Sequence, residues 1–281
     1  MSFTILHRIQ YTYSRPVFLE PLTLRFRPRC DGTQRLLAFS LALDPPPKGL
    51  TEWRDAEGND VALAWFSDMI DRLTVTARSE VETLRYDPFD FLVTDPGVGS
   101  LPARYDEVLA KVLAPCRFDS ATPTISKLAE EIREESGGET VRFLAALTTR
   151  LYETCEVVVR ETGDPMPPEE TLGGKQGSCR DLVVLFNACC RSVGLACRFV
   201  SGYQAGDRDQ ERRYLHAWSE VYLPGAGWRG YDPTLGLAVA DQHVAVAASH
   251  APEFAGPLGG MFRGTGVEAS MAAELQIETR P

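Results

Sequence analysis

A two-residue alternation of apolar with polar or small side chains constrains the first third of this chain more than any other feature. Segments 22–27, 37–43 and 71–78 carry it, and it is typical of β-strands with one buried face. The stretches 44–49 and 56–60 are rich in residues that favour turns. Short strands separated by turns predict a sandwich or a curled sheet in this part of the chain.

From about residue 100 the spacing of apolar residues becomes helical. We expect helices over 105–113, 125–135 and 140–154, the last with an apolar face typical of a core helix. A loop over 161–177 then precedes a long apolar helix and further strands. Strands, then helices, then strands again predict an α+β fold.

The length of 281 residues is enough for two domains. We expect an N-terminal β domain over 1–98, and a helical linker followed by the second domain over 99–281. The composition, 44% hydrophobic and 24% charged, is close to the soluble globular average and supplies ample material for a core.

Charge, hydropathy and cysteine usage argue against several classes of protein. The net charge of −10, from 39 acidic and 29 basic side chains, disfavours nucleic acid as a partner. No run approaches the roughly 18 apolar residues of a membrane helix, and the first residues lack the features of a secretion signal. Seven cysteines, with Cys189 and Cys190 adjacent, are untypical of a disulfide framework. We expect a cytoplasmic protein without membrane association; nothing in the sequence indicates an oligomeric state.

One cysteine has a setting that favours chemistry. Ser178 is a good helix N-cap, and the apolar run that follows it places Cys179 in the first helical turn. Unpaired N–H groups and the positive end of the dipole favour a thiolate there, and they can bind an oxyanion. Because cysteines are commonly buried, packing is an equally good local interpretation of Cys179. We expect the other six cysteines in the core: Cys30, Cys116, Cys155, Cys189, Cys190 and Cys197.

A predicted hairpin brings a histidine and an aspartate together. The alternating strand that begins near residue 214 ends at the turn 224–227, and 228–233 forms the returning strand. A turn centred near residue 224 or 225 puts His216 opposite Asp232, or one diagonal step away, on the same face. A slip of one residue would separate them.

Each residue has a plainer interpretation when it is taken alone. His216 could be an ordinary strand histidine, and a turn carboxylate before proline is the better interpretation of Asp232 by itself. Together with Cys179 they predict a triad in which the cysteine is the nucleophile, His216 the base and Asp232 the group that orients the imidazole.

Six segments resemble a known family, the transglutaminase-like enzymes. Those that resemble its three core motifs are Gly177–Asp181, His216–Tyr222 and Trp228–Thr234, and those that resemble the N-terminal β domain of bacterial members are His7–Ser14, Leu24–Pro28 and Asp55–Asn59. The resemblance implies a β-sandwich-like N-terminal domain followed by a papain-like core, with helices packed on an antiparallel sheet. It assigns the same roles to Cys179, His216 and Asp232.

The resemblance has departures and leaves lesser assignments open. Bacterial relatives often carry an Arg-Asp-Tyr segment after the histidine that matches His243, whereas residues 249–254 here differ, so substrate choice could differ too. We interpret His243 and His250 as surface or cleft-edge residues without a role. We expect no metal or cofactor, and no calcium loop of the EF-hand type is present. Residues proposed to bind the oxyanion or substrate, against plainer loop and core interpretations, are Gln176, Ser178 and Trp218.

Several functions stay open. We favour a cysteine peptidase or amidase, which resolves a thioester with water, slightly over a protein-glutamine γ-glutamyltransferase, which resolves it with an amine. A zinc site of Cys179, His216 and Asp232 is disfavoured, because no Cys-x-x-Cys or His-x-x-x-His spacing is present. A non-catalytic binding protein is the remaining alternative. The expected partner is a peptide or protein amide, and family context adds a peptide-ligating enzyme.

Overall fold

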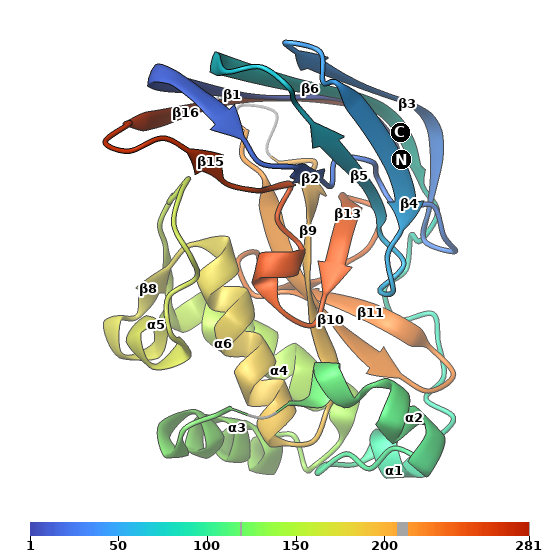
Figure 1. Ribbon diagram of the computed structural model, residues 1–281. Coiled ribbons are helices and arrows are strands. Elements are labelled where there is room, and N and C mark those ends of the chain that lie inside the picture. Colours follow the sequence, from blue (N-terminus) through green and yellow to red (C-terminus); the bar gives the residue numbers. More distant parts are fainter. Residues whose placement is uncertain (119, 207–212, 281) are drawn as a thin grey trace.

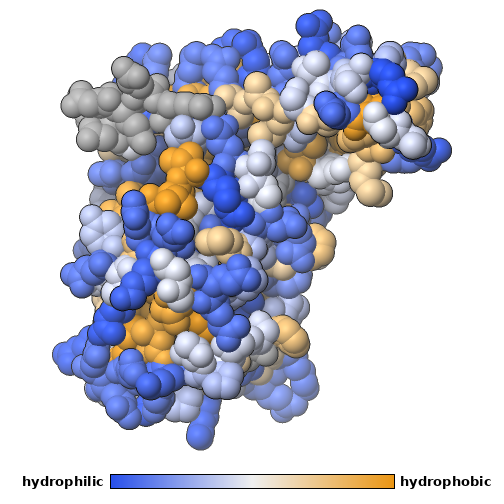
Figure 2. Space-filling model, turned by 90° about the vertical axis from the view of Figure 1, so that its left-hand side faces the viewer, coloured by the Kyte–Doolittle hydropathy of each residue, from blue (hydrophilic) through white to orange (hydrophobic). Residues whose placement is uncertain are grey.

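A computed structural model describes residues 1–118, 120–206 and 213–280. A half built of β-sheets lies above a half that combines helices with a third large sheet (Figure 1), which confirms the predicted α+β class. On the side seen in Figure 2 hydrophilic side chains predominate, and apolar side chains gather in a few patches, the largest over the helical half. Within the described ranges, none of the helices has the length and apolar character needed to cross a membrane.

Two antiparallel sheets form the sandwich in the upper half. The first contains β1 (Ser2–Leu19), β3 (Gln34–Asp44), β6 (Ile70–Thr83), β15 (Phe262–Arg263) and β16 (Ala269–Arg280), and the second β2 (Leu22–Leu24), β4 (Gly49–Arg54), β5 (Asp60–Trp65) and β14 (Leu258–Gly259). Side chains of both sheets, such as Ile9, Val75, Leu24 and Ala64, share one buried core. The predicted strands 37–43 and 71–78 fall within β3 and β6, whereas only the first half of the predicted strand 22–27 is in β2, which ends at Leu24.

The end of the chain returns to the N-terminal sheets, which the division into 1–98 and 99–281 did not anticipate. Strand β16 pairs with β1 over twelve positions, including Ile5 with Ile277, while β15 and β14 pair with β1 and β2. A central strand needs a partner on both edges, and β6 supplies only one edge of β1. The sandwich is therefore completed by residues about 260 positions away.

The lower half carries helices on one face of a five-stranded antiparallel sheet in the order β12-β11-β10-β9-β13. Its elements are α1 (Pro96–Gly99), α2 (Glu107–Val112), η1 (Ala114–Arg117), α3 (Pro123–Glu135), α4 (Thr140–Thr154), β7 (Glu156–Val157), α5 (Pro168–Gly174), β8 (Gln176–Gly177), α6 (Cys179–Ser192), β9 (Cys197–Gln204), β10 (His216–Leu223), β11 (Gly227–Asp232), β12 (Leu237–Ala238), β13 (His243–Ser249) and η2 (Pro252–Phe254). The three predicted helices correspond to α2, α3 and α4. The side chains of Asp106 and Glu139 cap α2 and α4 by accepting backbone N–H groups.

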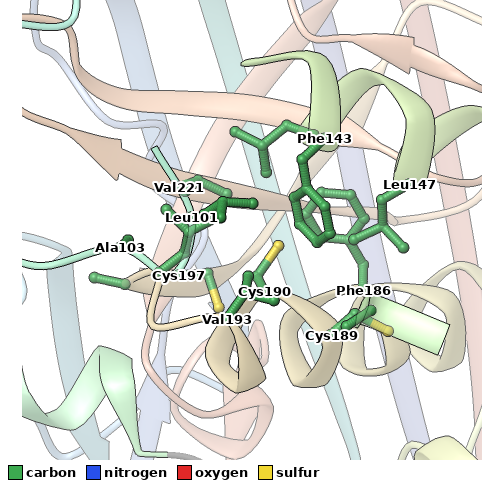
Figure 3. Close-up of a cluster of buried hydrophobic side chains, with 14 of the residues drawn as sticks. Leu101, Ala103, Phe143, Leu147, Phe186, Cys189, Cys190, Val193, Cys197 and Val221 are labelled. Atoms are coloured by element: carbon green, nitrogen blue, oxygen red, sulfur yellow. The ribbon is translucent and has the colours of Figure 1, made fainter. Parts of the chain in front are cut away.

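Helix α6 packs between the other helices and the sheet. Figure 3 shows Cys189 and Cys190 of α6 and Cys197 of β9 among Phe143 and Phe186, without disulfide bonds. Burial confirms the core prediction for five cysteines, Cys116, Cys155, Cys189, Cys190 and Cys197. The prediction is wrong for Cys30, which is exposed because it lies in the loop after β2.

One face of the long first sheet packs against the second sheet of the sandwich and also against β13 of the lower half. Ile9 and Val17 of β1 face the sandwich core, whereas Phe3 and Ile5 at its start pack against Val244 of β13 and its neighbours. His7 lies between these regions, with Nδ1 3.1 Å from the hydroxyl of Tyr203. The edge strand β13 is therefore buried along its whole length.

Two amide side chains of the N-terminal sheets pair with the backbone of β13. Gln34 donates to the carbonyl of Ala245 (2.9 Å) and accepts from its N–H (2.7 Å). Asn59 likewise donates to the carbonyl of Ala248 (2.9 Å) and accepts from its N–H (2.8 Å). Both side chains are buried, so together with the backbone N–H of Arg29, which also donates to Ala245, they pair with an edge of β13 that has no neighbouring strand.

Replacing Asn59 with Ala should lower the free energy of unfolding by about 3 kcal/mol, because the N–H and C=O of Ala248 stay buried without partners. The measurement is the urea midpoint. Gln276→Ala, which removes an exposed amide from β16, is the matched control and should change the midpoint little. Equal midpoints for the two variants would contradict this account of the contact between the halves.

Candidate active site

The start of α6 is shaped by one buried carboxylate. Ser178 is the N-cap residue and Cys179 the first residue of the helix, which confirms the predicted placement. The Oδ2 atom of Asp181 accepts hydrogen bonds from the backbone N–H (2.8 Å) and the hydroxyl (2.7 Å) of Ser178. These bonds fix the direction in which Cys179 enters the helix.

The other oxygen of Asp181 holds the preceding loop. It accepts from the backbone N–H of Met166 (2.7 Å) and from the guanidinium of Arg160. Burial opposes the charge of Asp181, but these bonds and those from Ser178 outweigh it and lower the pKa of the carboxyl. Arg180, next to the cysteine, donates to the carbonyls of Arg160 and Thr162. The loop before Cys179 is thereby tied to the helix that carries it.

The hairpin of β10 and β11 has the register that the sequence predicts. Ser219 pairs with Tyr231, and continuing the ladder puts Trp218 beside Asp232 and His216 one diagonal step away. The Nε2 atom of His216 lies 2.6 Å from Oδ2 of Asp232. The side chain of Cys179 is also a neighbour of this imidazole and helps to raise its pKa. The structure thus brings the three predicted residues together.

The protonation of His216 follows from its neighbours. Burial lowers the pKa of the imidazole, but the charge of Asp232, the hydrogen bond to it and the interactions with Cys179 outweigh burial and raise this pKa to about 10. The imidazolium is therefore the form present near neutral pH. Because Nε2 of His216 is hydrogen-bonded to Asp232, Nδ1 is the ring nitrogen that is left to exchange a proton with the sulfur of Cys179.

Asp232 is fully buried and its oxygens accept several hydrogen bonds. Its Oδ1 atom accepts from the backbone N–H groups of Thr234 (2.9 Å) and Leu235 (3.2 Å). Burial opposes the charge, but the cation on His216 and the hydrogen bonds from His216 and His243 hold the pKa of Asp232 well below its usual range. Asp232 is thus an anion throughout the neutral range.

These two pKa shifts set a pH window for stability. The depressed pKa of Asp232 contributes stability above the unfolded value of about 4, and this is lost as the pH falls through the folded value. The raised pKa of His216 contributes stability that is complete below about 6.5 and is lost as the pH rises through about 10. The pair therefore stabilises the fold most between about pH 4 and 6.5.

The expectation for His243 is wrong: the residue is buried and belongs to the site. Its Nε2 atom lies 3.0 Å from Oδ2 of Asp232, the oxygen that His216 also contacts. Its ring packs against those of Trp218 and His216, with centroid distances of 5.1 and 5.9 Å. The apolar run 244–248 directly after it, typical of a buried strand, is the signal that could have indicated this. His250, half exposed, lies against Glu57 (3.0 Å) at the contact between the two halves.

The three lesser candidates have different positions. Gln176 is exposed in β8, three residues before Cys179. The hydroxyl of Ser178 is bonded to Asp181, so it belongs to the helix cap. Trp218 is buried and packs beside His216, with ring centroids 6.3 Å apart, so it supports the imidazole from within the sheet.

One set of side chains has donors suited to a divalent metal. The nitrogens and oxygen of His216, Asp232 and His243 lie within 4.8 Å of one another. The set differs from the alternative considered from sequence, since it contains His243 in place of Cys179. Hydrogen bonds from both imidazoles to Asp232 account for the same proximity without an ion.

Comparison with known proteins finds two family models that match parts of this chain. Residues 3–82 match the bacterial transglutaminase-like N-terminal region, and residues 126–233, which include Cys179, His216 and Asp232, match the transglutaminase-like superfamily. The chain is 27% identical over 260 residues to an uncharacterized protein of Mycobacterium tuberculosis, covering 87% of this chain and 82% of the relative. An uncharacterized protein of Mycobacterium leprae is 25% identical over 270 residues, which are 93% of each chain.

Two further relatives carry functional descriptions. A protein-glutamine gamma-glutamyltransferase of Pseudomonas aeruginosa is 28% identical over 126 residues, which are 41% of this chain and 19% of that protein. A crystal structure of a candidate cysteine protease from Cytophaga hutchinsonii superposes with a TM-score of 0.72 at 22% identity, covering 100% of this chain and 92% of that one. The shared architecture agrees with the predicted fold.

At about pH 6.5, iodoacetamide should modify Cys179 about tenfold faster than the exposed Cys30, because the charged His216 lies against the sulfur. The five buried thiols should react more slowly still, since burial raises the pKa of each of them. His216→Ala should bring Cys179 to the rate of Cys30. Peptide mapping by mass spectrometry gives the rates, and equal rates in the unmodified protein would contradict the geometry.

Asp181→Ala should lower the free energy of unfolding by about 3 kcal/mol, because it leaves Arg160 and buried N–H groups without their acceptor. It should also slow alkylation of Cys179 by releasing the start of α6. Glu169→Ala, which removes an exposed carboxylate from the nearby α5, is the control for net charge. A variant Asp181→Ala with the stability of this control would contradict the assigned role.

Proposed function

Since residues 126–233 match the transglutaminase-like superfamily and residues 3–82 match the N-terminal region of its bacterial members, we propose that this chain is a thiol acyl-transfer enzyme acting on amide or peptide bonds. The nucleophile is Cys179, with His216 as acid and base and Asp232 as the orienting carboxylate. The observation that supports this most directly is the imidazole of His216, which lies 2.6 Å from Asp232 and has the side chain of Cys179 as a neighbour that raises its pKa.

The proposed reaction has two halves. The sulfur of Cys179 attacks the carbonyl carbon, a C–S bond forms, and the carbonyl electrons move to oxygen. The imidazolium of His216 gives its proton to the leaving nitrogen as the C–N bond breaks, which leaves a thioester. Water or an amine then attacks the thioester, His216 takes a proton from it, and the thiolate leaves.

The start of α6 supplies the proposed oxyanion site. N–H groups of the first helical turn have no intrahelical acceptors and lie at the positive end of the dipole. The N–H of Cys179 belongs to this turn. Gln176 stays a predicted second donor, because it is close in sequence and accessible to solvent.

The second half of the reaction separates two activities. We favour hydrolysis, and so a cysteine peptidase or amidase, because the side chain of His216 is 15% exposed and water can reach its ring. Amine transfer is the second candidate, supported by similarity to the glutamyltransferase of Pseudomonas aeruginosa. A non-catalytic binding protein would not need a complete triad, which makes this the least favoured alternative.

The cellular setting is also a proposal. None of the seven cysteines is in a disulfide, which supports the predicted cytoplasmic location. A peptide-ligating partner stays a prediction from family context.

The test is a mass spectrum of glutaminyl peptides incubated with the protein, with and without a primary amine. We expect deamidated or cleaved peptide as the main product in both samples, together with a thioester at Cys179 after rapid quenching. Cys179→Ala should lower the rate by a factor of about 1000 or more, since the thioester cannot form.

The control is Cys30→Ala, which removes the exposed cysteine and should react at the unmodified rate. An amine adduct as the main product would replace the peptidase proposal with amine transfer. Equal rates for Cys179→Ala and the unmodified protein would reject the thiol mechanism.

A further inference from the structure

A second imidazole contacts the carboxylate of the triad. The Nε2 atom of His243 lies 3.0 Å from Oδ2 of Asp232, and Nε2 of His216 lies 2.6 Å from the same oxygen. The centroids of the two imidazole rings are 5.9 Å apart. With the two backbone N–H groups on Oδ1, this carboxylate accepts four hydrogen bonds.

The protonation of His243 follows from its surroundings. Asp232 is an anion, so the nitrogen that faces it must carry a proton and donate. The Nδ1 atom is buried, and within the described ranges it has no hydrogen-bond partner. Burial lowers the pKa of His243 despite the charge of Asp232 and Asp241, and the cation on His216 lowers it further. His243 is therefore a neutral donor in the Nε2–H form.

His243 contacts Asp232 from a different strand than the other donors to this carboxylate do. It is the first residue of β13 and pairs with Gln204 of β9, whereas His216 begins β10. The edge of its ring meets the face of Trp218, with centroids 5.1 Å apart and planes at 73°. The imidazole is thus held from two sides while it donates to the carboxylate.

We infer that His243 is a positioning residue: by donating from Nε2, it keeps the carboxylate of Asp232 directed at His216, so that the imidazole stays against Cys179. This inference rests on the proposed thiol chemistry. His243 does not itself contact the sulfur or a substrate; it acts through Asp232. Without the donor, the carboxylate can rotate and its bond to His216 weakens.

The experiment compares two variants of similar size. His243→Gln keeps an N–H donor near the position of Nε2, and His243→Leu fills the space without a donor. The rate of alkylation at Cys179 by iodoacetamide is measured from about pH 5 to 9, a range in which His216 stays protonated and Asp232 stays ionised in the unmodified protein. The other ionisable groups that face these residues are Asp241 and Cys179 itself. Circular dichroism and thermal unfolding establish that each variant is folded.

We expect the rate at neutral pH to fall about 10- to 100-fold in His243→Leu, with the profile displaced to higher pH, and to be largely restored in His243→Gln. A folded His243→Leu with the unmodified profile would overturn the inference, as would a His243→Gln variant as slow as the leucine variant. His250→Ala, which removes the imidazole that follows the other end of β13 and faces Glu57, should leave the profile unchanged.

A measurement on the unmodified protein covers the case in which His243→Leu does not fold. Nitrogen NMR of the imidazoles should find His243 protonated at Nε2 at neutral pH, and a proton at Nδ1 would overturn the inference. If Cys179 of the unmodified protein is no more reactive than Cys30, the proposed function fails. Failure of the variants alone rejects only the role of His243.

Discussion

The buried carboxylate of Asp232 is the constraint on which this site depends. An unpaired charge in that position would be strongly destabilising, so the surrounding elements must supply donors in fixed places. They come from β10 through His216, from β13 through His243, and from the turn after β11 through Thr234 and Leu235. The orientation of the imidazole toward Cys179 is a consequence of satisfying this charge.

The N-terminal sheets contribute to the site although they supply no residue to it. Their long first sheet covers β13, and Gln34 and Asn59 replace the neighbouring strand that β13 lacks. These contacts help to bury the strand that His243 begins. The segment Asp55–Asn59, which resembles a motif of the bacterial N-terminal domain, is the turn that makes this contact. The resemblance therefore has a structural reason.

The meeting of His216 with Asp232 could be predicted because local patterns determine it. A cap residue before an apolar run starts α6, and the turn with left-handed Gly225 and Gly227 sets the register of His216 against Asp232. Their meeting with Cys179 also needs α6 to pack on β10, which the order of motifs in a known family supplied.

The partners of His243 could not be read in the same way. The apolar run 244–248 indicates a buried strand, but no short pattern shows that Gln34, 211 positions away, pairs with Ala245 of this strand. The return of β16 to the first sheet was missed for the same reason, because its partner β1 lies at the other end of the chain. Cys30 was misassigned because residue type alone does not indicate exposure.

The most direct test of the account is an NMR titration of the four histidines in the unmodified protein. The account predicts that His216 stays protonated until the pH approaches about 10, whereas His7, buried beside Tyr203, stays neutral down to about pH 4. A His216 that titrates near its ordinary value of about 6.5 would show that the carboxylate does not hold the imidazolium, and would contradict the account.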